Sequence, residues 1–370
     1  MVSRRTCIGT ICGYGGALAA AHAAPVLAAA VATGVSPETT ARFWHREGNA
    51  AACEICPHGC ILRVGKTGKC RNRTNRNGRL VALGYGRPCA VHIDPIEKKP
   101  FYHVLPGART YSLGVAGCNL RCKNCQNYQI SQRSPLETEN VFLPPEKAVE
   151  EALRRKCTVV AFTYTEPTVW LEYVIDTATL AKKAGLRTVM VSSGYINAAP
   201  FETVMPLLDA VRIDLKSFSD RVYRDLNAGT LQPVLDTLLR AKKGNLWLEI
   251  INLVVPQWND RPEELRRLCR WVAANLGSDT PVHFSRFYPM YQLSQGYPTP
   301  VATLKKAVAI AREEKLSYVY IGNVADAGSV TICPSCGKTV LDRSGYIVTV
   351  NRLKNGRCGY CGTVIPGVWR

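Results

Sequence analysis

Short apolar, β-branched runs alternate with longer amphipathic stretches through the middle of the chain. The runs predict seven strands, at residues 110–116, 158–163, 188–192, 210–215, 246–255, 282–287 and 318–321. Between most of them apolar residues recur at three- and four-residue spacing, which predicts helices that include residues 145–155, 168–183, 261–276 and 301–314. Strands that are apolar on both faces and alternate with helices indicate an α/β fold with a parallel sheet.

Polar residues follow the ends of the predicted strands. Because the carboxyl ends of parallel strands meet at one edge, α/β barrels build their active sites there. The number of units favours a partial (β/α)6, TIM-like barrel over a complete barrel of eight. The successive strand ends carry a cysteine-rich loop, Tyr164-Thr165-Glu166-Pro167, Ser192-Ser193-Gly194-Tyr195, Asp214-Leu215-Lys216, Asn252 with Pro256, and Arg286-Phe287-Tyr288-Pro289.

Sixteen cysteines occur in the 370 residues, and most of them are grouped. A secreted disulfide scaffold would be much shorter, so clustered thiolates indicate bound metal in a reducing or anaerobic setting. We divide the chain into a leader-like region (1–35), a Cys-rich metal-binding region (50–108), the predicted barrel (109–325) and a metal-binding tail (330–370). The three groups are Cys53, Cys56, Cys60 and Cys70; Cys118, Cys122 and Cys125; and Cys333, Cys336, Cys358 and Cys361.

The central group has the spacing C-x3-C-x2-C, with no fourth cysteine close behind it. Three thiolates can hold three corners of a [4Fe–4S] cube and leave the fourth iron open, whereas a structural site fills every coordination position. An open iron can bind a small chelating molecule through an amine and a carboxylate, which the methionine end of S-adenosylmethionine (SAM) offers. The alternative is half of a zinc site completed from elsewhere, but zinc knuckles usually come as C-x2-C pairs.

The two outer groups have four cysteines each, so each can close around a metal. The first reads C-x2-C-x3-C-x9-C and suits zinc or a second, fully ligated iron–sulfur cluster, with zinc slightly preferred. The tail holds two C-x2-C-G knuckles, typical of a zinc ribbon or a rubredoxin-like module. Zinc is preferred there too, while a single iron would make the tail an electron relay.

The loop Gly117-Cys118-Asn119-Leu120-Arg121-Cys122-Lys123-Asn124-Cys125 resembles the signature of the radical SAM superfamily. The resemblance implies a partial barrel of radical SAM type and a reductive cleavage of SAM to a 5′-deoxyadenosyl radical. Thr165-Glu166-Pro167 is similar to the Gly-Gly-Glu-Pro motif of that superfamily, although Tyr164-Thr165 stands in place of the glycines. Glu166 would then accept a hydrogen bond from the SAM amine; the alternative is a solvated surface carboxylate.

Three further residues are candidate SAM contacts. Ser193 would reach the SAM carboxylate or ribose, although serines are common at strand ends. Asp214 and Lys216 resemble the Asp-Leu-Lys motif of radical SAM activating enzymes. A Lys at this position would neutralise the SAM carboxylate, and Asp would orient it. An ordinary ion pair is the alternative. Arg286 and Asn323 are candidate anion or adenine contacts, and we expect His283, which lies within a strand, to be packed.

A narrower resemblance covers residues 53 to 370. The Cys-Pro-His-Gly-Cys block, the segment Asp94-Pro95-Ile96-Glu97-Lys98-Lys99-Pro100, the cysteine loop and the two tail knuckles look like the radical SAM member of the AmmeMemoRadiSam system. That group is similar to pyruvate formate-lyase activating enzymes. The resemblance implies Memo-like and AMMECR-like protein partners and a low-potential electron donor of flavodoxin or ferredoxin type. Activation of a glycyl radical enzyme is the alternative within this class.

The strongly basic composition leaves alternatives of other classes open. Two Zn(Cys)4 sites and one cluster would reduce the formal charge of +19 to about +14. A basic zinc protein that binds nucleic acid is therefore a second hypothesis, although we expect no nucleic-acid partner. An electron-transfer protein with an inert cluster is a third.

The first 35 residues resemble a twin-arginine leader. Ser3-Arg4-Arg5 precedes an apolar run rich in Ala and Gly, although Thr6-Cys7-Ile8 departs from the usual pattern. Because SAM and low-potential electrons are cytosolic supplies, we expect a cytoplasmic protein, with export, an uncleaved anchor or an early start codon as alternatives. No other stretch approaches 18 uninterrupted apolar residues, so we expect no further membrane span.

Overall fold

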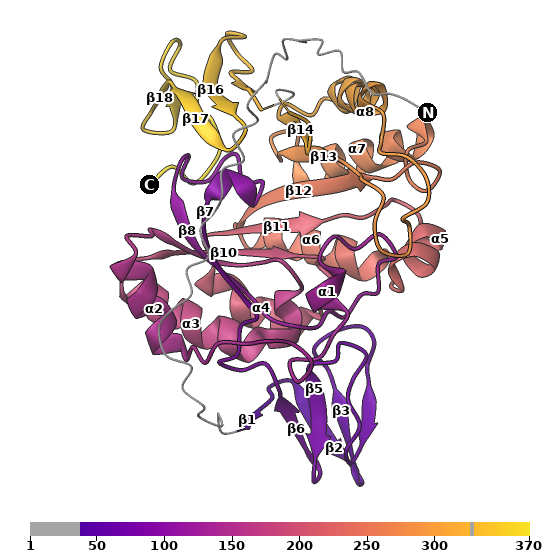
Figure 1. Ribbon diagram of the computed structural model, residues 1–370. Coiled ribbons are helices and arrows are strands. Elements are labelled where there is room, and N and C mark those ends of the chain that lie inside the picture. Colours follow the sequence, from indigo (N-terminus) through magenta and orange to yellow (C-terminus); the bar gives the residue numbers. More distant parts are fainter. Residues whose placement is uncertain (1–37, 326–328) are drawn as a thin grey trace, which may run out of the picture. The chain divides into compact units, whose positions relative to one another are not determined.

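The computed structural model describes residues 38–325 and 329–370, so the predicted leader lies outside the described residues. An open eight-stranded sheet has the order β14-β13-β12-β11-β10-β9-β8-β7 (Figure 1). All the neighbouring pairs are parallel except β7 and β8. The seven predicted strands are confirmed, and the sheet comprises β7 (Ala90–Pro95), β8 (Arg109–Gly114), β9 (Val159–Phe162), β10 (Arg187–Ser192), β11 (Ala210–Asp214), β12 (Trp247–Val254), β13 (Val282–Arg286) and β14 (Val319–Gly322).

Helices connect the parallel strands and cover one face of the sheet. Successive helices contact one another, from α2 against α3 to α7 against α8, as expected when all crossovers lie on the same side. Prolines at the first position of α2 and α7 favour helix initiation there. The four predicted helices are confirmed; the helical elements are α1 (Tyr128–Ser131), α2 (Pro145–Arg154), η2 (Pro167–Trp170), α3 (Leu171–Lys183), α4 (Ala198–Val204), η3 (Met205–Leu207), α5 (Asp220–Val222), η4 (Tyr223–Asn227), α6 (Gln232–Lys243), α7 (Pro262–Leu276) and α8 (Val301–Glu313).

Residues 96–108, which we call the inner segment, cover part of the other face. They begin with the short helix η1 (Ile96–Lys98) and lead into β8. Ile96, Phe101 and Val104 are fully buried against apolar side chains of β9, β10 and β11. The backbone N–H groups of Tyr102 and His103 donate to the Glu249 carboxylate of β12. The inner segment is therefore part of the core although it has no regular strand.

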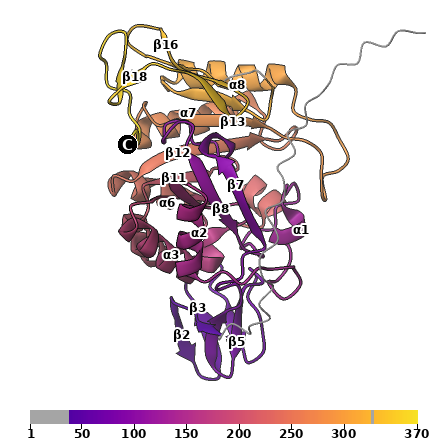
Figure 2. The same ribbon diagram turned by 60° about the vertical axis from the view of Figure 1, so that its left-hand side comes forward.

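The Cys-rich region forms two small antiparallel sheets, at the bottom of the view in Figure 2. One contains β1 (Thr39–Thr40), β5 (Arg73–Arg76) and β6 (Arg79–Ala82), and the other contains β2 (Trp44–Glu47), β3 (Ala50–Cys53) and β4 (Ile61–Arg63). Arg73 forms a buried ion pair with Glu172 of α3. A buried pair of this kind ties the region to the helical layer, because losing either partner would leave an uncompensated charge.

The tail consists of short antiparallel strands that contact the inner segment. Arg343 donates to the Tyr102 carbonyl at 2.6 Å, and Val104 forms a parallel bridge with Val368. None of the described helices is both long and apolar enough to span a membrane. The tail strands are β15 (Thr331–Ile332), β16 (Thr339–Ser344), β17 (Ile347–Asn351), β18 (Leu353–Lys354) and β19 (Arg357–Cys358).

Candidate active site

A cavity of about 440 Å³ lies between the central cysteine loop and the inner segment. It opens at the carboxyl ends of the parallel strands, where the sequence predicted an active site. Arg286 is not among its lining residues, but the three cluster cysteines and the four principal SAM candidates are. These residues are Cys118, Cys122, Cys125, Glu166, Ser193, Asp214 and Lys216.

The cysteine loop is held against η4. The backbone N–H of Arg121 donates to the Asn227 carbonyl at 2.9 Å, and Asn227 Nδ2 donates to Cys122 Sγ at 3.2 Å. The Leu120 N–H lies 3.3 Å from Cys118 Sγ. Amide donors directed at sulfur stabilise thiolates that bind iron. Cys118 and Cys122 have such donors, whereas Cys125 Sγ lies 3.1 Å from Ser131 Oγ. Together the three cysteines would be the protein ligands of a [4Fe–4S] cluster.

Burial controls the protonation of the loop thiols. It raises the pKa values of Cys118 and Cys122, and neighbouring thiols raise them further. Without metal these thiols are therefore neutral at pH 7, and a bound metal would displace their protons. Lys216 opposes the effect at Cys122, because its positive charge favours the thiolate.

Glu166 lines the cavity, but its carboxylate is already fully hydrogen-bonded within the protein. One oxygen accepts from the Thr168 N–H at 3.0 Å and from Ser192 Oγ at 2.7 Å. The other accepts from the Ser193 N–H at 2.7 Å and from Ser193 Oγ at 2.6 Å. These four donors match the lone-pair capacity of a carboxylate. Glu166 therefore orients the Ser193 turn, and its direct contact with a SAM amine stays a prediction.

Asp214 and Lys216 form an ion pair at 2.7 Å, and Arg212 shares the carboxylate at 2.6 Å. Burial raises the pKa of Asp214, but both cations outweigh it, so the net shift is downward. Burial lowers the pKa of Lys216, but Asp214 and Cys122 reverse the shift. Asp214 and Lys216 are therefore both charged at neutral pH. Arg212 was not predicted from the sequence, because its role depends on the register of β11.

The inner segment contributes cavity residues that the sequence did not place in the site. Lys99 Nζ lies 2.5 Å from Asp94, whose carboxylate also accepts from Tyr164 Oη at 2.5 Å. Burial lowers the pKa of Lys99 to about 8, against the opposing effect of Asp94. The sequence signal for Lys99 was the resemblance of residues 94–100 to a known family. That resemblance did not indicate where the segment lies in the fold.

The remaining candidates have mixed outcomes. Asn323 lines the cavity, and its side chain donates to the Arg286 carbonyl at 3.2 Å. Arg286 donates to the Thr299 carbonyl at 2.9 Å. His283 is buried and lies 2.8 Å from Glu249, so its predicted packed position is confirmed.

The tail cysteines form a site for a single metal ion. Their four sulfurs lie within 4.8 Å of one another, with Cys333 and Cys361 3.6 Å apart and Cys336 and Cys358 3.7 Å apart. Sulfurs in a tetrahedron with metal–sulfur bonds of about 2.3 Å are separated by about 3.8 Å. The distances thus suit zinc or a single iron equally.

The first cysteine group does not converge in the same way. Cys53, Cys56 and Cys70 are buried, and Cys60 is half-buried. Within residues 38–325 and 329–370, the tail group is the one set of three or more metal-ligating side chains whose ligand atoms lie within 4.8 Å of one another. Metal binding by Cys53, Cys56, Cys60 and Cys70 therefore stays a prediction.

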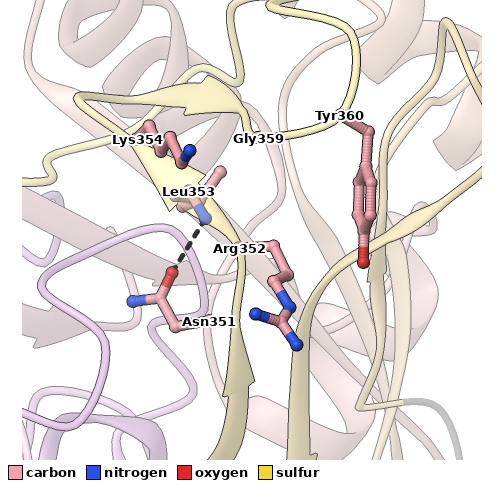
Figure 3. A pocket seen from close by; sticks show the side chains of 6 residues that line it. All are labelled: Asn351, Arg352, Leu353, Lys354, Gly359 and Tyr360. Carbon is pink, nitrogen blue, oxygen red and sulfur yellow. Dashed lines mark hydrogen bonds between the residues drawn. The ribbon is translucent and has the colours of Figure 1, made fainter.

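A cleft of about 330 Å³ lies beside the tail knuckles. Arg352, Lys354 and Tyr360 line it together with Asn351, whose side chain accepts from the Leu353 N–H at 3.0 Å (Figure 3). The cleft is open and basic, and it contains no described cysteine sulfur. The cleft shares no lining residue with the cavity at the central loop.

Comparison with known proteins agrees with this geometry. Residues 114–269 match the radical SAM superfamily. Uncharacterized protein MJ0808 of Methanocaldococcus jannaschii is 43% identical over 329 residues, which cover 88% of this chain and 98% of that protein. The pyruvate formate-lyase-activating enzyme of Listeria monocytogenes is 25% identical over 238 residues, 58% of this chain and 92% of that enzyme.

Among solved structures, a domain of a pyruvate-formate lyase-activating enzyme from Bacteroides vulgatus covers 44% of this chain and 98% of that domain, with 16% identity and a TM-score of 0.40. A similarity this low supports no conclusion of its own. The sequence relationship extends over nearly the whole of MJ0808, and the superfamily match includes the cysteine loop and the strand ends that carry Glu166, Ser193 and Asp214. The chain therefore belongs to the same family as MJ0808 and is an enzyme of the radical SAM superfamily.

Proposed function

We propose that the protein cleaves SAM reductively at a [4Fe–4S] cluster held by Cys118, Cys122 and Cys125, and that the product radical takes a hydrogen atom from a substrate in the cavity. The observation that carries the proposal is that these cysteines and the Asp214–Lys216 pair line one cavity. When bound, the cluster supplies one electron to SAM, whose C–S bond breaks to give methionine and a 5′-deoxyadenosyl radical.

The protein side chains prepare this cavity for an anionic, chelating ligand. Lys216 is charged and next to Cys122, so it would attract the SAM carboxylate to the open iron. Asp214 holds Lys216 in place. Because Asp214 also pairs with Arg212, its single negative charge does not fully neutralise Lys216. The Ser193 N–H and hydroxyl both donate to Glu166, which leaves the Ser193 oxygen able to accept a hydrogen bond.

Anaerobic reconstitution tests the proposal. The wild-type protein should bind about four irons at the central loop and release 5′-deoxyadenosine and methionine when dithionite and SAM are added. Cys122→Ala should abolish SAM cleavage, because the cube loses a ligand next to the open iron. Cys89→Ala removes a half-buried cysteine outside the three groups and should keep the activity. Retention of SAM cleavage by Cys122→Ala would refute the assignment.

We also propose protein partners for the enzyme and a way to identify its substrate. The motifs shared with the AmmeMemoRadiSam group support action with Memo-like and AMMECR-like proteins, and the activating-enzyme relatives support activation of a glycyl radical enzyme as the alternative. Because SAM and low-potential reductants are cytosolic supplies, we place the reaction in the cytoplasm. Transfer of deuterium from a labelled candidate partner into 5′-deoxyadenosine would identify the substrate.

A further inference from the structure

Two stretches of the chain near the cysteine loop contain no acidic residue. Residues 55–93 and 98–136 lack aspartate and glutamate, yet they contain many lysines and arginines. One stretch includes most of the Cys-rich region, and the other includes the loop itself. We call Lys69, Arg71, Arg121 and Lys123 the loop rim.

Backbone contacts bring these two stretches together. A Cβ atom built on Gly117 would lie 2.4 Å from the Cys70 carbonyl oxygen, so the chain beside Arg71 touches the chain beside Cys118. The Asn72 side chain donates to the Ala116 carbonyl at 3.0 Å. On the other side of the loop, His58 Nε2 lies 2.7 Å from the Asn119 carbonyl. The loop rim is therefore assembled by packing between two regions that are distant in sequence.

The cations of the loop rim are not neutralised by the chain. Lys69, Arg121 and Lys123 are exposed, Arg71 is half-buried, and none of the four forms a salt bridge with a described residue. Arg71 Nη1 is buried and has no hydrogen-bond partner. Lys69 Nζ lies 3.5 Å from His58 Nδ1, whose ring contacts the cysteine loop through Nε2, so Lys69 lies close to the loop.

One acidic residue approaches the rim from η4. Asp225 is exposed and lies two residues before Asn227, which holds the loop, but Arg224 is exposed beside it. Because Asp225 and Arg224 carry opposite charges, the pair does not change the net positive charge of the rim side chains. Surfaces of one charge beside a redox site attract partners of the opposite charge and orient them on encounter.

We propose that the loop rim docks an acidic protein that carries one electron to the cluster. The inference rests on the proposed function, which needs one electron for each SAM cleaved. The carrier is oxidised by one electron and the cluster held by the loop is reduced by one, with no covalent bond made or broken. A carrier on the rim would be next to Cys122, which Arg121 and Lys123 flank in sequence, and none of the four rim residues lines the substrate cavity.

Binding to a purified bacterial flavodoxin with a strongly acidic surface tests the docking directly. The variant Lys69→Glu/Arg121→Glu/Lys123→Glu reverses three exposed charges and leaves the cysteines and the backbone contacts in place. The control Lys183→Glu/Lys243→Glu/Lys305→Glu reverses three exposed charges on α3, α6 and α8 that form no salt bridge with described residues. Titration calorimetry should show Kd at least tenfold higher for the rim variant and within twofold of wild type for the control. Added salt should reduce the difference.

Two sources of electrons separate failure of docking from failure of the proposed function. With dithionite, a small reductant, both variants should still cleave SAM and contain the same iron as wild type. The dithionite rate of each protein then serves as the reference for its own flavodoxin rate. With reduced flavodoxin, the rim variant alone should be at least tenfold slower. Equal flavodoxin affinity and rates in the three proteins would overturn the docking surface. Absence of cleavage with dithionite in the wild type would instead overturn the proposed function.

Discussion

The balance of charge at the centre of the cavity depends on three residues at the end of β11. Asp214 holds Arg212 and Lys216 through separate oxygens, and Lys216 also interacts with Cys122. A carboxylate shared by two cations leaves a net positive charge, which suits a negatively charged cluster and the carboxylate of its ligand. The structure shows the ion pair at the wall of the cavity, and its contact with SAM stays a prediction.

Replacing Lys216 by methionine tests this charge. Lys216→Met should raise the KM for SAM tenfold to a hundredfold, because a charge-assisted hydrogen bond is worth about 1.5–3 kcal/mol. Lys216→Arg should recover part of the affinity. Steady-state kinetics with dithionite would measure both effects, and an unchanged KM in Lys216→Met would contradict the role.

Glu166→Gln tests whether the hydrogen bonds accepted by the Glu166 carboxylate stabilise the fold. One carboxylate oxygen faces the Thr168 N–H and the other faces the Ser193 N–H, so the amide group of Gln would meet a backbone donor in either orientation. We expect a loss of about 1–3 kcal/mol in the free energy of unfolding. Denaturant unfolding measures it, with Ser193→Ala as the milder control. An unchanged free energy of unfolding in Glu166→Gln would show that these hydrogen bonds do not stabilise the fold.

At the scale of elements, the strands and helices could be predicted because each follows a local period, as in β9 and α7. The inner segment could not be predicted in this way. His103 contacts Glu249, Tyr320 and Pro366, which are 146, 217 and 263 residues away in sequence. Side chains such as Cys118 and Lys216 were identified from motifs, whereas Arg212 and Lys99 depend on register and long-range packing, which no local pattern contains.

His103 gives the inner segment a pH-dependent stability. Its Nδ1 lies 2.7 Å from the Pro366 carbonyl and its Nε2 lies 2.7 Å from Tyr320 Oη, so the neutral ring donates to the first and accepts from the second. Burial lowers the pKa of His103 from 6.5 to about 4, despite the opposing effect of Glu249. Between these values the unfolded chain binds a proton that the folded chain does not, so stability falls as the pH is lowered.

We expect His103 to account for a loss of about 3 kcal/mol in the free energy of unfolding between pH 6.5 and pH 4. His103→Asn should remove this part of the slope while leaving the parts due to other groups, including His283. Urea unfolding of both proteins over this pH range measures the difference. Parallel pH profiles for the two proteins would contradict the assignment.

At the scale of the whole molecule, the tail packs against the inner segment and contributes Tyr346 to the lining of the central cavity. Arg343 and Val368 both reach this segment, and the tail metal site is built from separate cysteines. Metal at the tail should therefore stabilise the fold without affecting the central cluster.

Cys336→Ser tests this separation. It should lose the tail metal and lower Tm by several degrees, while the iron bound at the central loop stays unchanged. Metal analysis and thermal unfolding of the anaerobic protein measure the two effects. Loss of the central iron in this variant would show that the two sites are coupled.

The bridge between Val104 and Val368 has a consequence for biogenesis. A growing polypeptide on the ribosome reaches residue 104 long before residue 368 is made, so the inner segment lacks its contact with the tail during most of translation. Iron delivered at that stage would meet an incompletely folded chain. Loading of the cofactor should thus follow release from the ribosome, and maturation factors would act on a completed polypeptide.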